Sequence, residues 1–281
     1  MDVRVEFPQA ALSAAGRRVP QGWTSDRVTT VFTLAAMFPL AAAIHATGGA
    51  LLPHLLGTLF VSIGWTYLFG RLRSRDMNWH AVPVAIVFTL MVPAVPLWQS
   101  LVALSFGIVV GEQIFGGRGY SFLSPAVAAL AFLFFSFPTA AGEQAPAALV
   151  TIAVLPGALL LIASGLISWR IVIAVAIGFT GWIALKGFGL PSLAMLTTSL
   201  ALGVTFLICE PTSAAATNPG RWAYGLFTGA LLVILGDAGQ GVGSTASIVF
   251  AALLGSVFAP LIDRIVIHFN IRRRRQRRWP G

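Results

Sequence analysis

The segment STASIVFAALLGSVFAPLIDRIVIH, residues 244–268, decides the fold class, because residues 244–262 carry no charged side chain. A helix of about 20 mainly apolar residues is long enough to cross the roughly 30 Å hydrocarbon core of a bilayer. The segment therefore predicts a membrane-spanning helix.

The composition of the whole chain agrees with this prediction. Of the 281 residues, 57% are hydrophobic and 10% are charged, and the mean hydropathy is +0.86. Soluble domains carry roughly 25% charged residues, so a water-soluble enzyme is excluded. Cys209 is the only cysteine, which excludes a disulfide scaffold and any metal site built from several thiolates. We expect an all-α polytopic membrane protein.

Similar apolar runs predict about ten transmembrane helices. If both termini are cytoplasmic, every Lys and Arg except Lys186 lies on the inner side, as the positive-inside rule requires. The location that fits is a bacterial-type cytoplasmic (inner) membrane. The third and ninth spans are short, so they are candidates for tilted or re-entrant segments. The predicted spans are 28–48, 51–70, 80–95, 98–114, 124–140, 147–165, 169–187, 193–209, 222–236 and 244–268.

The predicted spans divide the chain into a cytoplasmic N-terminal segment (1–27), a transmembrane domain (28–268) and a basic cytoplasmic tail (269–281). The net charge of +9 raises the question of nucleic-acid binding. However, the tail directly follows an apolar segment, where basic residues face anionic lipid head groups. We therefore expect the lipid bilayer, and no nucleic acid, as a partner. The tail arginines are Arg272, Arg273, Arg274, Arg275, Arg277 and Arg278.

Two glycine-rich turns indicate an internal repeat. GGRGYSFLSPA (116–126) follows the fourth span and GDAGQGVGSTA (236–246) follows the ninth. With five spans in each half (about 28–141 and 147–268), the second half is inverted relative to the first. Inverted repeats are associated with a central site at the middle of the membrane. The alternative is that Gly and Pro simply separate the helices of an ordinary bundle.

Acidic residues near the membrane are rare enough to consider one by one. Glu112 and Glu210 lie near the inner ends of their spans and are candidates for an ion or proton path, because intramembrane ionisable groups usually face a cavity or a partner. The alternative is interfacial pairing with Arg118 and Arg221. Asp263 lies beside Arg264, and we expect it to form an interfacial ion pair.

No catalytic residues and no metal ligands can be assigned. A Ser/His/Asp arrangement, a P-loop and an HExxH motif are all missing from the sequence. His45 and His54 could both lie near the outer face as ligands of a haem, but no motif supports that interpretation.

Glycine and hydroxyl side chains gather in two segments, 115–126 and 209–225. Glycines let the backbone approach a ligand closely, and the N-terminus of a helix favours anionic or electron-rich groups. The candidate binding residues are Gly116, Gly117, Gly119, Ser121 and Ser124 in the first segment and Thr212, Thr217 and Asn218 in the second.

Three motifs in these regions resemble those of one family. FGGRGYSFLSPAVAALAFL (115–133) is similar to FGG-x-G-x-NPFNPA of the RnfD/NqrB family, the membrane subunits of Rnf complexes and of sodium-pumping NADH:quinone oxidoreductase. FLICEPTSAAATNPGRWAYGLFTG (206–229) resembles F-x-x-TDPVT…GR-x-x-YG, and SIVFAALLGSVFAPLID (247–263) resembles A-x-LL-x-N-x-x-x-PLID. Ser121 and Ser124 stand where the first motif has Asn, and Glu112 stands where Rnf members often have Lys. The resemblance covers roughly residues 24–265.

The resemblance implies ten helices in two inverted five-helix repeats, similar to urea transporters, in a complex that passes electrons between flavins and moves Na⁺ or H⁺. Many members carry FMN esterified to a threonine in a D-x-x-[ST]-G-A-T motif between the fifth and sixth spans. Here that loop is PTAAGEQAP (138–146) and the motif is absent. We therefore expect a shortened member that holds FMN or riboflavin non-covalently, at the candidate residues given above.

The leading hypothesis is an integral membrane subunit that supports flavin-linked electron transfer, as a redox or non-catalytic part of an oxidoreductase complex. Other membrane subunits, and subunits with flavin or iron–sulfur centres, would be its partners. A small-solute transporter or channel of the same fold is the first alternative, because a fold does not determine a function. A membrane redox subunit of a biosynthetic pathway is the second.

Overall fold

The computed structural model describes residues 25–73, 79–117, 121, 123–137, 148–187, 197–238 and 241–278, with the backbone alone for 271–278. These residues form helices and no strand, so the prediction of an all-α protein is confirmed. The helices are α2 (Ser25–Ala46), α3 (Leu52–Leu72), α4 (Ala81–Met91), α5 (Leu97–Ile108), α6 (Pro125–Ser136), α7 (Ala148–Ala163), α8 (Trp169–Leu185), α9 (Thr198–Leu202), α10 (Asn218–Ala238) and α11 (Thr245–Arg278). Two π-helices, η1 (Val109–Gln113) and η4 (Gly203–Ile208), continue α5 and α9.

Each predicted span coincides with one of these helices, but the lengths differ from the prediction. Three helical segments are long and apolar enough to cross a membrane, Asp26–Ala46, Leu52–Leu72 and Thr245–Asn270. The third span is short as expected, since α4 ends at Met91. The ninth is not short, because α10 already begins at Asn218, with Pro219 in its first turn, where proline costs no hydrogen bond. The short helix of the second half is instead the eighth, Thr198–Ile208.

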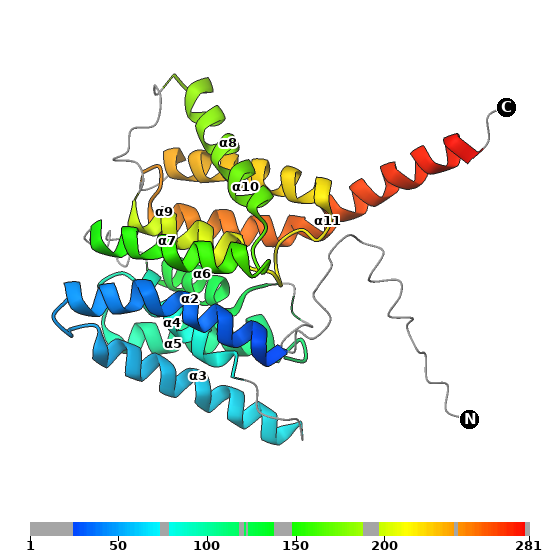
Figure 1. Ribbon diagram of the computed structural model, residues 1–281. Coiled ribbons are helices and arrows are strands. Elements are labelled where there is room, and N and C mark those ends of the chain that lie inside the picture. Colours follow the sequence, from blue (N-terminus) through cyan, green and yellow to red (C-terminus); the bar gives the residue numbers. More distant parts are fainter. Residues whose placement is uncertain are drawn as a thin grey trace, which may run out of the picture.

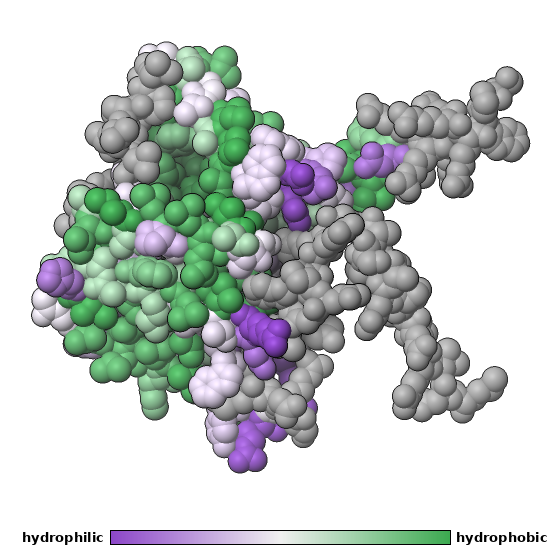
Figure 2. All heavy atoms as spheres, viewed as in Figure 1, coloured by the Kyte–Doolittle hydropathy of each residue, from purple (hydrophilic) through white to green (hydrophobic). Residues whose placement is uncertain are grey.

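The bundle has two ends of different character. Helix α2 begins and α11 leaves at one end (Figure 1), which we call the basic end, and hydrophilic side chains gather there in Figure 2. At the opposite end, residues 47–51 connect α2 to α3, and we call it the turn end. The positive-inside rule predicted that Lys186 lies on the opposite side from the other basic residues. Lys186 lies at the end of α8, and its Nζ is 2.7 Å from Asp237 Oδ2 of α10.

The shortest helices form the centre of the bundle. Every residue of α4 except Val82 is buried, and so is most of η4. The long helices surround them and expose apolar side chains outward, including Leu56 and Phe60 on α3 and Leu155 and Leu159 on α7. Much of the surface in Figure 2 is accordingly apolar. A bundle that is apolar on its outside and in its core is suited to a lipid environment.

Glycines bring the helices into close contact. In α10, Gly225 and Gly229 face Ala174, Val175 and Gly178 of α8, and a Cβ placed on Gly229 would lie 2.4 Å from the carbonyl oxygen of Val175. Gly107 and Gly111 of α5 and η1 meet α6 in the same way. Both pairs have the small-xxx-small spacing that lets membrane helices approach closely.

Helices of the two halves pack in a corresponding pattern. Helix α3 packs against α5 as α8 packs against α10, and α5 packs against α6 as α10 packs against α11. Between the halves, α2 contacts α7, α4 contacts α9, and α6 contacts α11. Each of these contacts joins helices that hold the same position in their half.

Candidate functional site

Two buried carboxyl side chains lie toward the basic end, where η1 and η4 end. Glu112 is within η1 and has 7% of its surface exposed, and Glu210 follows η4 and has 5% exposed. The sequence predicted that both lie near the inner ends of their spans, but it did not predict the π-helices. A π-helix inserts an extra residue per turn and occurs frequently at functional sites.

The backbone around Glu112 is held on two sides. Its carbonyl oxygen accepts a hydrogen bond from the amide of Gly117 at 3.0 Å. The neighbouring Gln113 carbonyl accepts one from the guanidinium of Arg73, which comes from the end of α3. These bonds attach the end of η1 to the glycine-rich turn and to α3. Arg118, the predicted partner of Glu112, lies outside the described residues.

Glu210 lies in a tight turn between η4 and α10. The hydroxyl of Thr212 donates to its Oε1 at 3.1 Å, and its backbone carbonyl accepts from the amides of Ser213 and Ala214. Tyr224, fully buried in α10, donates its hydroxyl to the carbonyl of Ile208 at 3.0 Å. The end of η4 is therefore tied to α10 beside the carboxylate.

Arg221, the predicted partner of Glu210, is itself buried, with 8% of its surface exposed, and its Nε donates to the Ala215 carbonyl at 3.4 Å. A solvent-exposed ion pair is therefore not the environment of these two residues.

The prediction for Asp263 is wrong. Instead of pairing with Arg264, its carboxylate accepts hydrogen bonds from the amides of Ala216 and Thr217, at 2.7 and 3.1 Å, and from the Thr217 hydroxyl. The residues before α10 have unpaired N–H groups that favour a negative charge. Asp263 of α11 therefore caps the start of α10.

The glycine-rich turn after η1 is partly described. Gly116 and Gly117 have φ angles of 113° and 92°, which other residues rarely adopt. A Cβ on Gly117 would meet no atom within 4 Å. Ser124 is buried directly before α6, and Ser121 is half-buried. Gly119 lies outside the described residues.

The second predicted segment has its polar groups engaged within the protein. The hydroxyl of Thr217 binds Asp263 and accepts from the amide of Gly220. Asn218 accepts a hydrogen bond from the guanidinium of Arg170. Thr212 binds Glu210, as described above.

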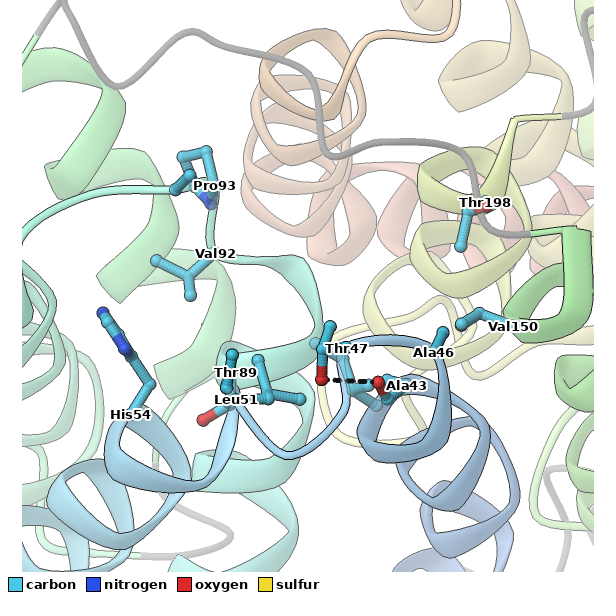
Figure 3. Close-up of a pocket in the computed structure, with 13 residues that line it drawn as sticks. Ala43, Ala46, Thr47, Leu51, His54, Thr89, Val92, Pro93, Val150 and Thr198 are labelled. Atoms are coloured by element: carbon cyan, nitrogen blue, oxygen red, sulfur yellow. Dashed lines mark hydrogen bonds between the residues drawn. The ribbon is translucent and has the colours of Figure 1, made fainter.

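A cavity that the sequence did not predict lies at the turn end (Figure 3). It measures about 350 Å³ and is lined by the ends of α2, α3, α4, α7 and α9. His54, considered above as a haem ligand, lines it and places its Nε2 3.0 Å from the carbonyl oxygen of Val95. Its lining residues are scattered over both halves of the chain and share no local motif.

Comparison with known proteins identifies the family. The family model described as "NQR2, RnfD, RnfE family" matches residues 18–148 and 140–272. One subunit of the Na(+)-translocating NADH-quinone reductase of Stutzerimonas stutzeri (strain A1501) is 31% identical over 277 positions, which cover 79% of this chain and 68% of the relative.

The corresponding subunits of the same enzyme from two other bacteria extend the comparison. The protein of Haemophilus influenzae (strain PittEE) is 30% identical over 312 positions, covering 88% of this chain and 75% of its own length. The protein of Ectopseudomonas mendocina (strain ymp) is 28% identical over 310 positions, which cover 90% of this chain and 76% of the relative. The resemblance drawn from the three motifs is thereby confirmed, and this chain belongs to the NQR2, RnfD, RnfE family of membrane proteins.

Proposed function

We propose that this protein is the membrane subunit of an electron-transport complex, where it supports flavin-linked electron transfer coupled to Na⁺ or H⁺ translocation. Family membership supports the general assignment, since the relatives are named as subunits of a Na⁺-translocating NADH-quinone reductase. The observation that carries the ion-translocating part is the burial of Glu112 and Glu210 at the ends of two π-helices.

The two carboxyl groups suit an ion path for an energetic reason. Ionisable residues within membrane segments are rare and usually face a cavity or a partner, because a charge costs about 2.5–3.5 kcal/mol at the centre of a membrane helix on insertion scales. Carboxylate oxygens bind hard cations such as Na⁺ and also accept protons. We assign Glu112 and Glu210 to the inner part of the path.

The flavin region of the proposal centres on the turn after η1. Gly116 and Gly117 leave the backbone without side chains, Ser121 and Ser124 add hydroxyl groups, and α6 begins at Pro125 with its N-terminal amides. These groups fit the polar edge of a flavin, or its phosphate, at a helix N-terminus. From the second half, the proposal includes Thr212, Thr217 and Asn218, which bind Glu210, Asp263 and Arg170 in this structure. A bound flavin would supply one- and two-electron transfer.

Non-covalent attachment is the expected mode. The loop 138–146 has no D-x-x-[ST]-G-A-T sequence. The alignment with the E. mendocina protein extends over 310 positions, more than the 281 residues of this chain. That relative therefore has segments with no counterpart here, which fits a shortened member.

The inverted repeat is part of the proposal because such repeats are associated with a central site at the middle of the membrane. The corresponding helix contacts in the two halves support it. So do the two glycine turns: the amide of Gly117 binds the carbonyl five residues before it, and the amide of Gly241 does the same.

The kind of partner subunit that we propose follows from the cysteine content of the chain. With one cysteine, it cannot hold an iron–sulfur cluster by itself. Electrons would therefore enter and leave through other membrane subunits that carry flavin or iron–sulfur centres, in a bacterial-type inner membrane.

Optical spectroscopy of the purified full-length protein tests the flavin assignment. We expect a flavin spectrum near stoichiometric occupancy, and release of all flavin into the supernatant on acid precipitation. Flavin that stays with the precipitate would show covalent attachment and contradict the non-covalent proposal. A Gly117→Val variant should lose flavin, because valine disfavours a φ of 92°. The matched control is Gly165→Val, at a second positive-φ glycine (φ 73°) between α7 and α8, which should keep it.

A further inference from the structure

The cavity at the turn end (Figure 3) includes neither the two carboxylates nor the residues of the proposed flavin region among its lining residues, and these lie toward the basic end. Its volume of about 350 Å³ is within the usual range for small-molecule sites, roughly 300–1,000 Å³. Ala43 and His54 line it from the first half of the chain, and Val150 and Thr198 from the second. The cavity therefore lies where the two halves meet.

The walls of the cavity exclude a charged ligand. Among the described residues, those that line it include no Asp, Glu, Lys or Arg, and small side chains such as Ala43, Ala46 and Ala50 create the space. Moving an unpaired charge into such surroundings costs several kcal/mol or more. An uncharged and mainly apolar ligand is the kind that these walls accept.

Two threonines of the lining, Thr47 and Thr89, have their hydroxyl protons already engaged. The hydroxyl of Thr47 donates to the carbonyl of Ala43 at 2.9 Å (Figure 3). The hydroxyl oxygens of Thr89 and Thr58 are 2.7 Å apart, and each hydroxyl can also donate to a backbone carbonyl of its own helix. Whichever of the two hydroxyls donates to the other, the second can donate to a helix carbonyl, so both protons are used within the protein.

His54 leads to the same result. A carbonyl oxygen only accepts hydrogen bonds, so the Nε2 that contacts Val95 must carry the proton. In the neutral ring Nδ1 is then an acceptor. Thr198 and Thr151 share a hydrogen bond in which either hydroxyl can be the donor, so Thr198 does not distinguish a donor ligand from an acceptor ligand. Thr47, Thr89 and His54 can therefore offer a ligand lone pairs but no protons.

From the uncharged walls and the acceptor groups we infer that this cavity binds an uncharged, mainly apolar small molecule that donates a hydrogen bond, such as one with a hydroxyl or amide N–H group. This inference does not depend on the proposed electron-transfer function, because it rests on residues at the other end of the bundle.

Binding of three matched probes tests the inference, with full-length protein in lipid nanodiscs and fluorine NMR as the readout. 4-Fluorophenol should bind saturably beyond its partition into empty nanodiscs. 4-Fluoroanisole, which lacks the donor, should bind about two- to tenfold more weakly, the range for one neutral hydrogen bond. 4-Fluorobenzoate, which is charged, should not bind. Equal binding of phenol and anisole, saturable binding of benzoate, or no saturable binding of the phenol would each overturn the inference.

Variants locate the binding. Ala46→Phe fills the cavity from α2 and should abolish saturable binding of 4-fluorophenol. Ala41→Phe places the same ring on an exposed position of α2 outside the cavity and should bind as the wild type does. Thr47→Val removes an acceptor while keeping the shape, so it should weaken the phenol about two- to tenfold and leave the anisole unchanged. Unaltered phenol binding in Ala46→Phe would show that the molecule binds elsewhere, whereas unaltered phenol binding in Thr47→Val alone would point to Thr89 or His54 as the acceptor.

Discussion

Glu112, Glu210 and Asp263 carry the same functional group in three different environments. Glu112 is buried within η1 and Glu210 is buried shortly after η4, whereas the carboxylate of Asp263 caps the start of α10. The proposed ion path therefore includes Glu112 and Glu210, which are buried at the ends of two helices, and leaves out Asp263, whose carboxylate binds the residues at the start of α10.

Replacing Glu112 or Glu210 with Gln removes a charge and nearly preserves the shape. If these residues form the ion path, ion flux of the reconstituted complex should fall by about tenfold or more, equivalent to about 1.4 kcal/mol on the barrier. Flux into proteoliposomes measures it, with thermal stability as a check on folding. Asp237→Asn, at the exposed ion pair with Lys186, is the control and should retain normal flux. Wild-type flux in both Gln variants would end the assignment.

The capping role of Asp263 predicts a loss of stability. Asp263→Ala leaves the amides of Ala216 and Thr217 without their acceptor, and removal of a helix cap costs about 0.5–2 kcal/mol. The midpoint of thermal unfolding of the purified protein should fall accordingly. Arg264→Ala should be nearly neutral, since Arg264 is exposed. An equal effect of both substitutions would instead favour the ion pair between these neighbours.

At the scale of elements, close packing depends on glycines. The contact of α8 with α10 has no room for side chains at Gly225 and Gly229. In a bilayer, where apolar burial between helices contributes little, such close contacts are a main source of helix association. The neighbouring Tyr224 and Arg221 stand on the same helix, so this packing also sets the surroundings of Glu210.

We expect Gly229→Ala to destabilise the protein by about 1–3 kcal/mol, the usual cost of overpacking, because the new Cβ would lie 2.4 Å from the carbonyl oxygen of Val175. Chemical or thermal unfolding in detergent measures the change. The control is Gly181→Ala on α8, where a Cβ meets no atom within 4 Å. That variant should be neutral or slightly more stable, since Ala favours a helix over Gly. If the two variants were equally stable, the close contact would not hold in solution.

At the scale of the whole molecule, α2 begins and α11 ends on the same side (Figure 1), and hydrophilic side chains gather there (Figure 2). The positive-inside rule assigns this side to the cytoplasm. Helix α11 continues beyond the bundle to Arg278 (Figure 1), so its arginine-rich part would stand near the anionic head groups of the inner leaflet.

Cysteine labelling tests this orientation. The single native cysteine, Cys209, is buried and should give little background. A membrane-impermeant maleimide should label Ala50→Cys, at the turn end, in intact cells. His268→Cys, at the basic end, should react only after the membrane is permeabilised. Labelling of His268→Cys in intact cells would reverse the topology.

Much of the fold follows from apolar length and charge position, which are local properties of the sequence. The run at 244–268 predicted α11 and the other runs predicted the remaining helices, because a bilayer requires long apolar segments with satisfied backbones. The three motifs indicated the family, and the rarity of acidic residues singled out Glu112 and Glu210, which are buried in the structure. The predicted length was wrong for the ninth span, because α10 begins at Asn218 with Pro219 in its first turn and not at residue 222.

Other features exist only when distant segments meet. Asp263 neighbours Arg264 along the chain, yet it binds amides 46 and 47 residues away, because a helix N-terminus is a better partner for a carboxylate than an exposed guanidinium. The cavity likewise joins Ala43 and His54 to Val150 and Thr198, and no local pattern marks these residues. The sequence by itself determined the class of protein, the positions of its helices and its family. The tertiary structure decided which polar groups are used up in holding the helices together, and which remain for a ligand, because hydrogen bonds between helices depend on contacts that no local periodicity encodes.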